Sequence, residues 1–162
     1  MWLPKALAGL STVLLLAGCT AAPLYGSGPG FAPSAPLIAY AEPVSRLDQV
    51  IYNELRLRLP PSEAPGAPRL AVTAATTGFD EALSRTANPN TLRGVTVTAT
   101  ATLTPAVPGA NPVRITRAAT ANYTTNDSAL GSQEAALEAS ERAAKAAAEQ
   151  LRLALLAELA RR

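Results

Sequence analysis

Residues 95–104 read Val95-Thr96-Val97-Thr98-Ala99-Thr100-Ala101-Thr102-Leu103-Thr104, an unbroken alternation of apolar side chains and threonines. Successive side chains of a β-strand point to opposite faces of the sheet. The alternation therefore predicts a strand with one apolar face and one hydroxyl face.

The segment that follows predicts a partner for this strand. Residues 105–112 contain prolines and a glycine and are expected to form a loop. Residues 113–125 alternate again, and the pattern is disturbed at Arg117. We expect an antiparallel hairpin with a bulge near Arg117.

Upstream, the sequence predicts a strand, a helix and a second strand. Residues 37–40 are expected to form the short first strand. Residues 44–59 carry Leu47, Val50, Ile51 and Leu55 at helical spacing, and Pro60-Pro61 ends that helix. Residues 70–74 are expected to form the second strand.

A long helix is predicted from Ser128 or Ser132 to Leu159, because this stretch is rich in Ala, Glu, Leu and Arg and has no proline. The side chains expected on its apolar side are Leu137, Ala144, Ala147, Ala148, Leu151, Leu155 and Leu159. The resulting order, β-α-β-β-β-α, predicts an α+β fold with two helices packed on one face of a four-stranded, mainly antiparallel sheet. The opposite face would be rich in threonine and exposed.

The first nineteen residues predict export and lipidation. Residues 1–18 have the charged start and apolar stretch of a signal peptide, and Leu16-Ala17-Gly18-Cys19 resembles a bacterial lipobox. Cys19 would carry a diacylglyceryl thioether and an amide-linked acyl chain, enough for a stable anchor. The alternative is an ordinary signal peptide with a chance cysteine. Residues 19–35 would form a Pro/Gly-rich tether and residues 36–162 the folded domain.

Composition excludes several kinds of function. The chain has 162 residues, no histidine, one cysteine and a net charge of +2. Histidine-based triads and an intramolecular disulfide are therefore excluded, and nothing in the charge favours a nucleic-acid partner. Asp80-Glu81 is the one pair of adjacent acids outside the predicted helices. We interpret these two residues as solvent-exposed turn residues rather than as a catalytic pair. We expect no enzyme activity, metal or cofactor.

Arginine far outnumbers lysine in the chain. Guanidinium groups bind phosphate and carboxylate with paired donors, although coding bias would give the same excess. If an anionic ligand binds, we expect Arg85, Arg93, Arg114 and Arg117 to form the patch.

The whole chain resembles the LPS-assembly lipoprotein LptE family, the outer-membrane partners of the LptD β-barrel. The resemblance depends on the order of several motifs together with the β-α-β-β-β-α pattern. The motifs are Cys19 followed by Pro23-Leu24-Tyr25-Gly26, then Arg46-Leu47-Asp48-Gln49-Val50-Ile51-Tyr52-Asn53-Glu54-Leu55, and then Ala147-Ala148-Glu149-Gln150-Leu151. The sequence departs from the family at Thr20-Ala21, where relatives often have Gly and an aromatic residue, and at Ser132-Gln133, where some have a cation.

The resemblance implies a non-enzymatic plug that sits inside the LptD-type barrel, helps it fold and contacts lipopolysaccharide, with Arg85 matching the family's basic loop residue. Because Thr20 rather than Asp follows the cysteine, we expect the outer membrane. One alternative is an accessory lipoprotein of an envelope lipid-transport ATPase system. Another is a small-ligand binding lipoprotein, whose apolar cavity would need Phe31, Tyr52, Phe79 and Tyr123.

Overall fold

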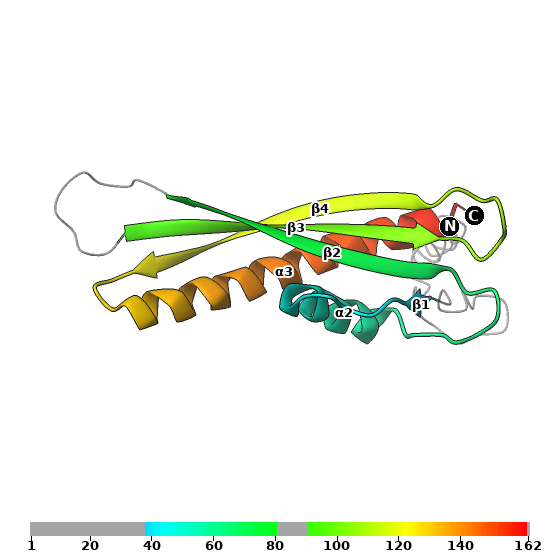
Figure 1. Ribbon diagram of the computed structural model, residues 1–162. Coiled ribbons are helices and arrows are strands. Elements are labelled where there is room, and N and C mark those ends of the chain that lie inside the picture. The colour runs from blue at the N-terminus through cyan, green and yellow to red at the C-terminus, as the bar shows by residue number, and fades with distance from the viewer. Residues whose placement is uncertain (1–37, 81–90, 162) are drawn as a thin grey trace, which may run out of the picture. The chain divides into compact units, whose positions relative to one another are not determined.

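The computed structural model describes residues 38–80 and 91–161. Its elements follow the predicted order and confirm the α+β fold (Figure 1). They are β1 (Ala39–Tyr40), α2 (Arg46–Arg58), β2 (Arg69–Asp80), β3 (Thr91–Thr104), β4 (Val113–Thr125) and α3 (Ala129–Leu159).

The sheet has the order β1-β2-β3-β4. β1 is parallel to β2, and the other neighbours are antiparallel. The β3–β4 register runs without interruption from Thr91 opposite Thr125 to Leu103 opposite Val113, and Arg117 lies directly opposite Ala99. The bulge predicted near Arg117 was therefore wrong, because the alternation of faces continues through this residue.

Both helices pack on one face of the sheet, as predicted (Figure 1). The apolar residues of β3 predicted to face inward are all buried, and so are Ile51, Tyr52 and Leu55 of α2. The buried residues of α3 are mostly alanines, whose small side chains let the helix lie close to the strands. Leu137 was predicted on this apolar side, but it is 41% exposed.

β2 is longer than the sequence predicted. It continues beyond Ala74 to Asp80, because each of its residues pairs with a residue of β3 as far as Asp80 opposite Arg93. Its second half, Ala75-Thr76-Thr77-Gly78-Phe79-Asp80, is exposed. The pairing with β3 therefore extends the strand where the hydrophobic pattern of β2 alone gives no signal.

The outer edge of β2 is closed by α2. Ser45 and Asp48 form a capping box at the start of the helix. The other carboxylate oxygen of Asp48 accepts a hydrogen bond from the backbone N–H of Ala74 at 2.7 Å. The Tyr52 hydroxyl oxygen accepts one from the N–H of Val72 at 2.8 Å. Two backbone donors that point away from β3 thus find buried partners on the helix.

Two tyrosines and an arginine extend this contact. The rings of Tyr40 and Tyr52 meet edge to face with centroids 5.7 Å apart, and the Arg56 guanidinium lies 5.2 Å from the Tyr40 centroid. Tyr40 donates a hydrogen bond to the Leu59 carbonyl at 2.7 Å. Burial raises the pKa of Tyr40 to about 12 and also raises the pKa of Tyr52. Both hydroxyls therefore favour the protonated state in the folded domain.

Candidate functional site

The face of the sheet opposite the helices, which we call the threonine face, is polar and almost uncharged. Residues directly opposite one another in antiparallel strands share a face, so the register assigns every position. Its threonines are Thr73, Thr77, Thr96, Thr98, Thr100, Thr102, Thr104, Thr116, Thr120 and Thr124. Its strand positions include no acidic residue, and their arginines, Arg69 and Arg114, lie at the same end. This confirms the predicted hydroxyl face.

Neighbouring strands are joined across this face by their hydroxyl groups. Thr96 and Thr120 are 2.8 Å apart at Oγ1, and Thr100 and Thr116 are 3.1 Å apart. Phe79 lies over Gly94, its direct partner on β3, where a Cβ atom would come within 2.1 Å of the ring. The aromatic ring thus fills the space that the missing side chain leaves.

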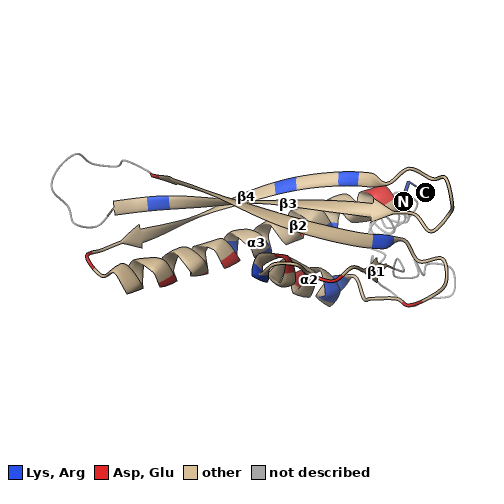
Figure 2. Cartoon of the chain, viewed as in Figure 1, with Lys and Arg blue, Asp and Glu red and all other residues tan. Residues whose placement is uncertain are grey.

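The structure separates the arginines that the sequence grouped. Arg93 lies opposite Tyr123, which is six residues beyond Arg117 on β4, so the two arginines are about 20 Å apart along the strand (Figure 2). The Nε of Arg93 lies 3.0 Å from a carboxylate oxygen of Asp80, and both side chains are largely exposed. Arg85 and Cys19 lie outside the described residues.

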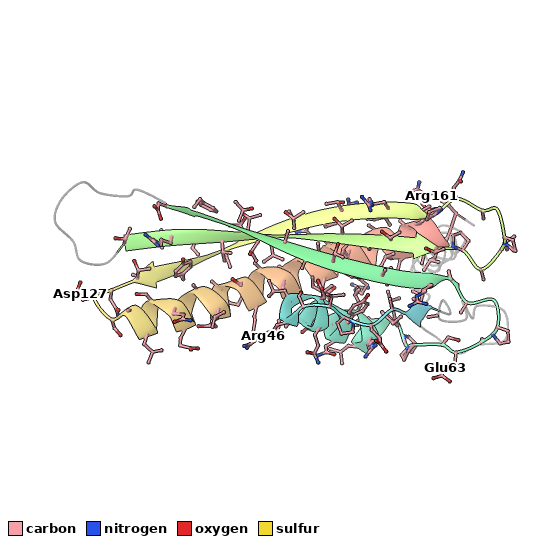
Figure 3. All side chains as sticks on the ribbon, viewed as in Figure 1. Arg46, Glu63, Asp127 and Arg161 are labelled. Atoms are coloured by element: carbon pink, nitrogen blue, oxygen red, sulfur yellow. The ribbon has the colours of Figure 1, made fainter. Side chains whose placement is uncertain are left out.

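Arg114 and Arg117 come together in a groove of about 360 Å³ at the start of β4, which we call the β4 groove. Residues 113–117 form one side, and Ala154, Ala157, Glu158 and Arg161, at or just after the end of α3, form the other. Figure 3 shows Arg161 at the end of the sheet where β4 begins. The prediction missed Arg161, because a terminal Arg-Arg pair in the sequence looks like a solvated helix end.

The backbone at the outer edge of β4 is covered by exposed guanidinium groups. Arg142 donates a hydrogen bond to the Asn122 carbonyl, and Arg117 donates one to the Thr116 carbonyl, both at 2.8 Å. These two carbonyls therefore point away from β3. Because outward-pointing groups alternate along an antiparallel edge strand, the N–H groups of Arg114, Thr116 and Ala118 also point outward.

The pocket that contains Phe79 and Tyr123 does not include Tyr52, the third described aromatic residue that a small-ligand cavity would need. Phe79 and Tyr123 line a pocket of about 240 Å³ with Arg93, Asp80 and Gly78. Tyr52 is buried in the core beside α2 and is not among the residues that line this pocket. Phe31 lies outside the described residues. Among the described residues, no helix combines the length and apolar character that a membrane span requires.

The sequence matches no family model and no curated protein. The fold, however, matches several solved structures. One is rare lipoprotein B from Shewanella oneidensis, with a TM-score of 0.57 and 15% identity over 75% of this chain and 93% of that chain. A protein described as a lipoprotein from Caulobacter crescentus has a TM-score of 0.54 and 21% identity over 76% of this chain and 90% of its own.

A minor lipoprotein from Acinetobacter baumannii has a TM-score of 0.52 and 15% identity, over 76% of this chain and 94% of that chain. At these identities the likeness concerns the fold alone. The described domain thus has a fold that is found in all three of these lipoproteins.

Proposed function

We propose that this chain is an outer-membrane lipoprotein of the LptE type. It is anchored through acylated Cys19, occupies the lumen of an LptD-type β-barrel, helps that barrel assemble and assists the insertion of lipopolysaccharide into the outer leaflet. Its contribution is structural rather than catalytic.

The threonine face is the observation that carries the barrel part of the proposal. The interior wall of a large outer-membrane barrel is polar, and a plug has to satisfy that wall without burying unpaired charges. Threonine hydroxyls both donate and accept hydrogen bonds, so a face composed largely of them adapts to many polar partners. The absence of acidic residues at its strand positions removes the charges that would be most costly to bury there.

The anchoring part of the proposal is supported by sequence and by fold. Leu16-Ala17-Gly18-Cys19 has the residues of a lipobox, and the domain shares its fold with three proteins described as lipoproteins. Two or more acyl chains would hold the protein stably in a bilayer. Thr20 after the cysteine favours the outer membrane.

We assign the lipopolysaccharide contact to the end of the sheet where β2 and β3 are linked. Arg93 is described there, and Arg85 belongs to the linking segment in the sequence. The exposed ion pair between Arg93 and Asp80 is weak in water, so a phosphate group can replace the carboxylate at little cost. Such a contact should weaken with salt.

The barrel part is tested by placing a charge in the middle of the threonine face. Thr98 lies between Ala75 and Ala118, so Thr98→Glu puts a carboxylate at its centre. We expect co-purification of the full lipidated chain with the barrel protein to fall at least about tenfold, because the charge would have to be buried unpaired. Gln133→Glu, on an exposed position of α3, is the matched control and should co-purify normally.

Thermal unfolding of both variants shows whether the domain remains folded. Normal co-purification of a folded Thr98→Glu variant would contradict the assignment of the threonine face to the barrel. Recovery of the chain in the inner-membrane fraction together with an ATPase would instead support the alternative of an accessory lipoprotein in lipid transport.

A further inference from the structure

We propose that the β4 groove binds an extended acidic segment of a partner protein, which adds to β4 as a fifth strand of the sheet. The groove lies at the opposite end of β4 from Tyr123, which pairs with the Arg93 that we assign to the lipopolysaccharide contact. Its occupant is therefore distinct from the phosphate groups that we assign to Arg93.

The backbone of β4 provides the hydrogen-bonding pattern that an added strand needs. The N–H groups of Arg114, Thr116 and Ala118 point outward, and no partner for them is found among the described residues. Of the outward carbonyls, that of Thr116 is covered only by the exposed side chain of its neighbour Arg117, which can swing aside. An unpaired edge of this kind is a template for pairing with another chain.

The charges of the groove select an acidic segment. Among the described lining residues, Arg114, Arg117 and Arg161 stand against one carboxylate, that of Glu158. Neutral side chains of Val113, Ile115, Ala154 and Ala157 complete its walls. An incoming strand would therefore meet an excess of positive charge beside an apolar surface, which favours carboxylates through both charge and paired hydrogen bonds.

The positions of two arginines also set the spacing of the partner's acids. Arg114 is on the threonine face, whereas Arg117, opposite Ala99, is on the helix face. Directly opposite residues of paired strands share a face, so one acid would stand opposite each arginine. The segment that fits best has two acidic residues three positions apart, one on each face.

The other edge of the sheet is partly covered by buried groups, which prevent another strand from pairing there. β1 and the buried side chains of Asp48 and Tyr52 occupy the edge of β2 as far as Ala74. At the β4 edge, by contrast, the carbonyls of Thr116 and Asn122 accept hydrogen bonds from exposed arginine side chains. The part of β2 beyond Ala74 is exposed as well, but it carries no arginine. The combination of an open strand edge with a cluster of arginines is therefore found at β4.

The test uses the full lipidated chain in detergent micelles and a synthetic peptide of alternating Thr and Val with two Glu three positions apart. The control peptide has Gln at both positions. We expect the Glu peptide to bind at least about tenfold more tightly than the Gln peptide. This preference should fall in Arg117→Gln and disappear when Arg114→Gln is combined with it. Arg58→Gln, an exposed position on α2, should retain it.

Amide hydrogen exchange in the lipidated chain without substitutions distinguishes strand addition from simple charge attraction. The amides of Thr116 and Ala118 should become protected when the Glu peptide binds, because both then donate to its backbone. Ala118→Pro removes one of these donors at an edge position where proline is tolerated, and it should weaken both peptides. Near-UV circular dichroism checks its fold.

Two results would overturn the proposal. One is peptide binding without new protection at Thr116 and Ala118. The other is failure of the Glu peptide to bind while phosphatidylglycerol vesicles bind through Arg114 and Arg117, which would make the groove a site for lipid headgroups.

Discussion

The two edges of the sheet are covered by different means. At the β2 edge, α2 places a carboxylate and a phenol against backbone N–H groups, and both side chains are buried, with Asp48 3% exposed and Tyr52 1% exposed. At the β4 edge, Arg117 and Arg142 contact backbone carbonyls from exposed positions. One edge is built into the core, and the other is only lightly shielded from solvent.

Burial decides what each contact contributes to stability. A hydrogen bond to a buried group is costly to remove because the partner is left without water, whereas an exposed guanidinium is readily replaced by water. The buried contacts at the β2 edge should therefore contribute substantially to the free energy of unfolding. The β4 edge should contribute little to stability and remain free to pair with another chain.

Removal of the Asp48 carboxylate should have the largest effect. Asp48→Ala deletes the capping box and leaves the N–H of Ala74 without its partner, so we expect a loss of about 3 kcal/mol in the free energy of unfolding. Urea unfolding measures it, with the exposed Gln49→Ala as the control on the same helix. A loss below about 1 kcal/mol would mean that α2 does not secure this edge.

Tyr52→Phe should have the next largest effect. The ring packing is retained, but the buried N–H of Val72 loses its acceptor, at a cost of about 2 kcal/mol. Tyr40→Phe is the comparison, because it removes a partly buried hydroxyl that donates to the Leu59 carbonyl, and we expect about 1 kcal/mol. Equal losses in the two variants would contradict a special role for the Tyr52 hydroxyl.

High pH should lower the free energy of unfolding, because Tyr40 loses its proton more easily in the unfolded chain. The pKa of Tyr40 is raised from 10.0 to about 12 in the folded domain, so the unfolded chain releases its proton first. The stabilisation that the protonated Tyr40 hydroxyl provides is complete below about pH 10, and it is lost as the pH rises toward about 12. Thermal unfolding across this range should show a fall that is smaller in Tyr40→Phe. An identical fall in this variant would assign the pH dependence to other groups.

Arg142→Ala should have the smallest effect. It removes an exposed ion pair to Glu138 and the hydrogen bond to the Asn122 carbonyl, and the loss should stay below about 1 kcal/mol. Urea unfolding of Arg142→Ala and Asp48→Ala under the same conditions compares the two losses directly. If the two variants lose similar stability, the two edges are closed equally firmly.

Local patterns predicted most of the fold. The alternation of residues 95–104 and 113–125 gave β3 and β4 their faces, and β4 has the predicted bounds Val113–Thr125. The long helix begins after its N-cap Ser128, one of the two predicted starts. These elements are readable because their hydrophobic period is a property of the local sequence.

Features that depend on distant residues were missed. The second half of β2 is held by pairing with β3, and the contacts of Asp48 and Tyr52 join residues that are far apart in the chain. The arginines were grouped by sequence, but only Arg114 and Arg117 share a groove, which also includes Arg161. No local period carries such information, since it arises when strands and helices meet.

Amide hydrogen exchange resolved by residue tests the contrast between the two edges most directly. The N–H groups of Val72 and Ala74 should exchange at least about a hundredfold more slowly than those of Thr116 and Ala118 in the free chain. Binding of the acidic peptide should then slow only the second pair. Similar exchange at all four amides before the peptide is added would contradict the account.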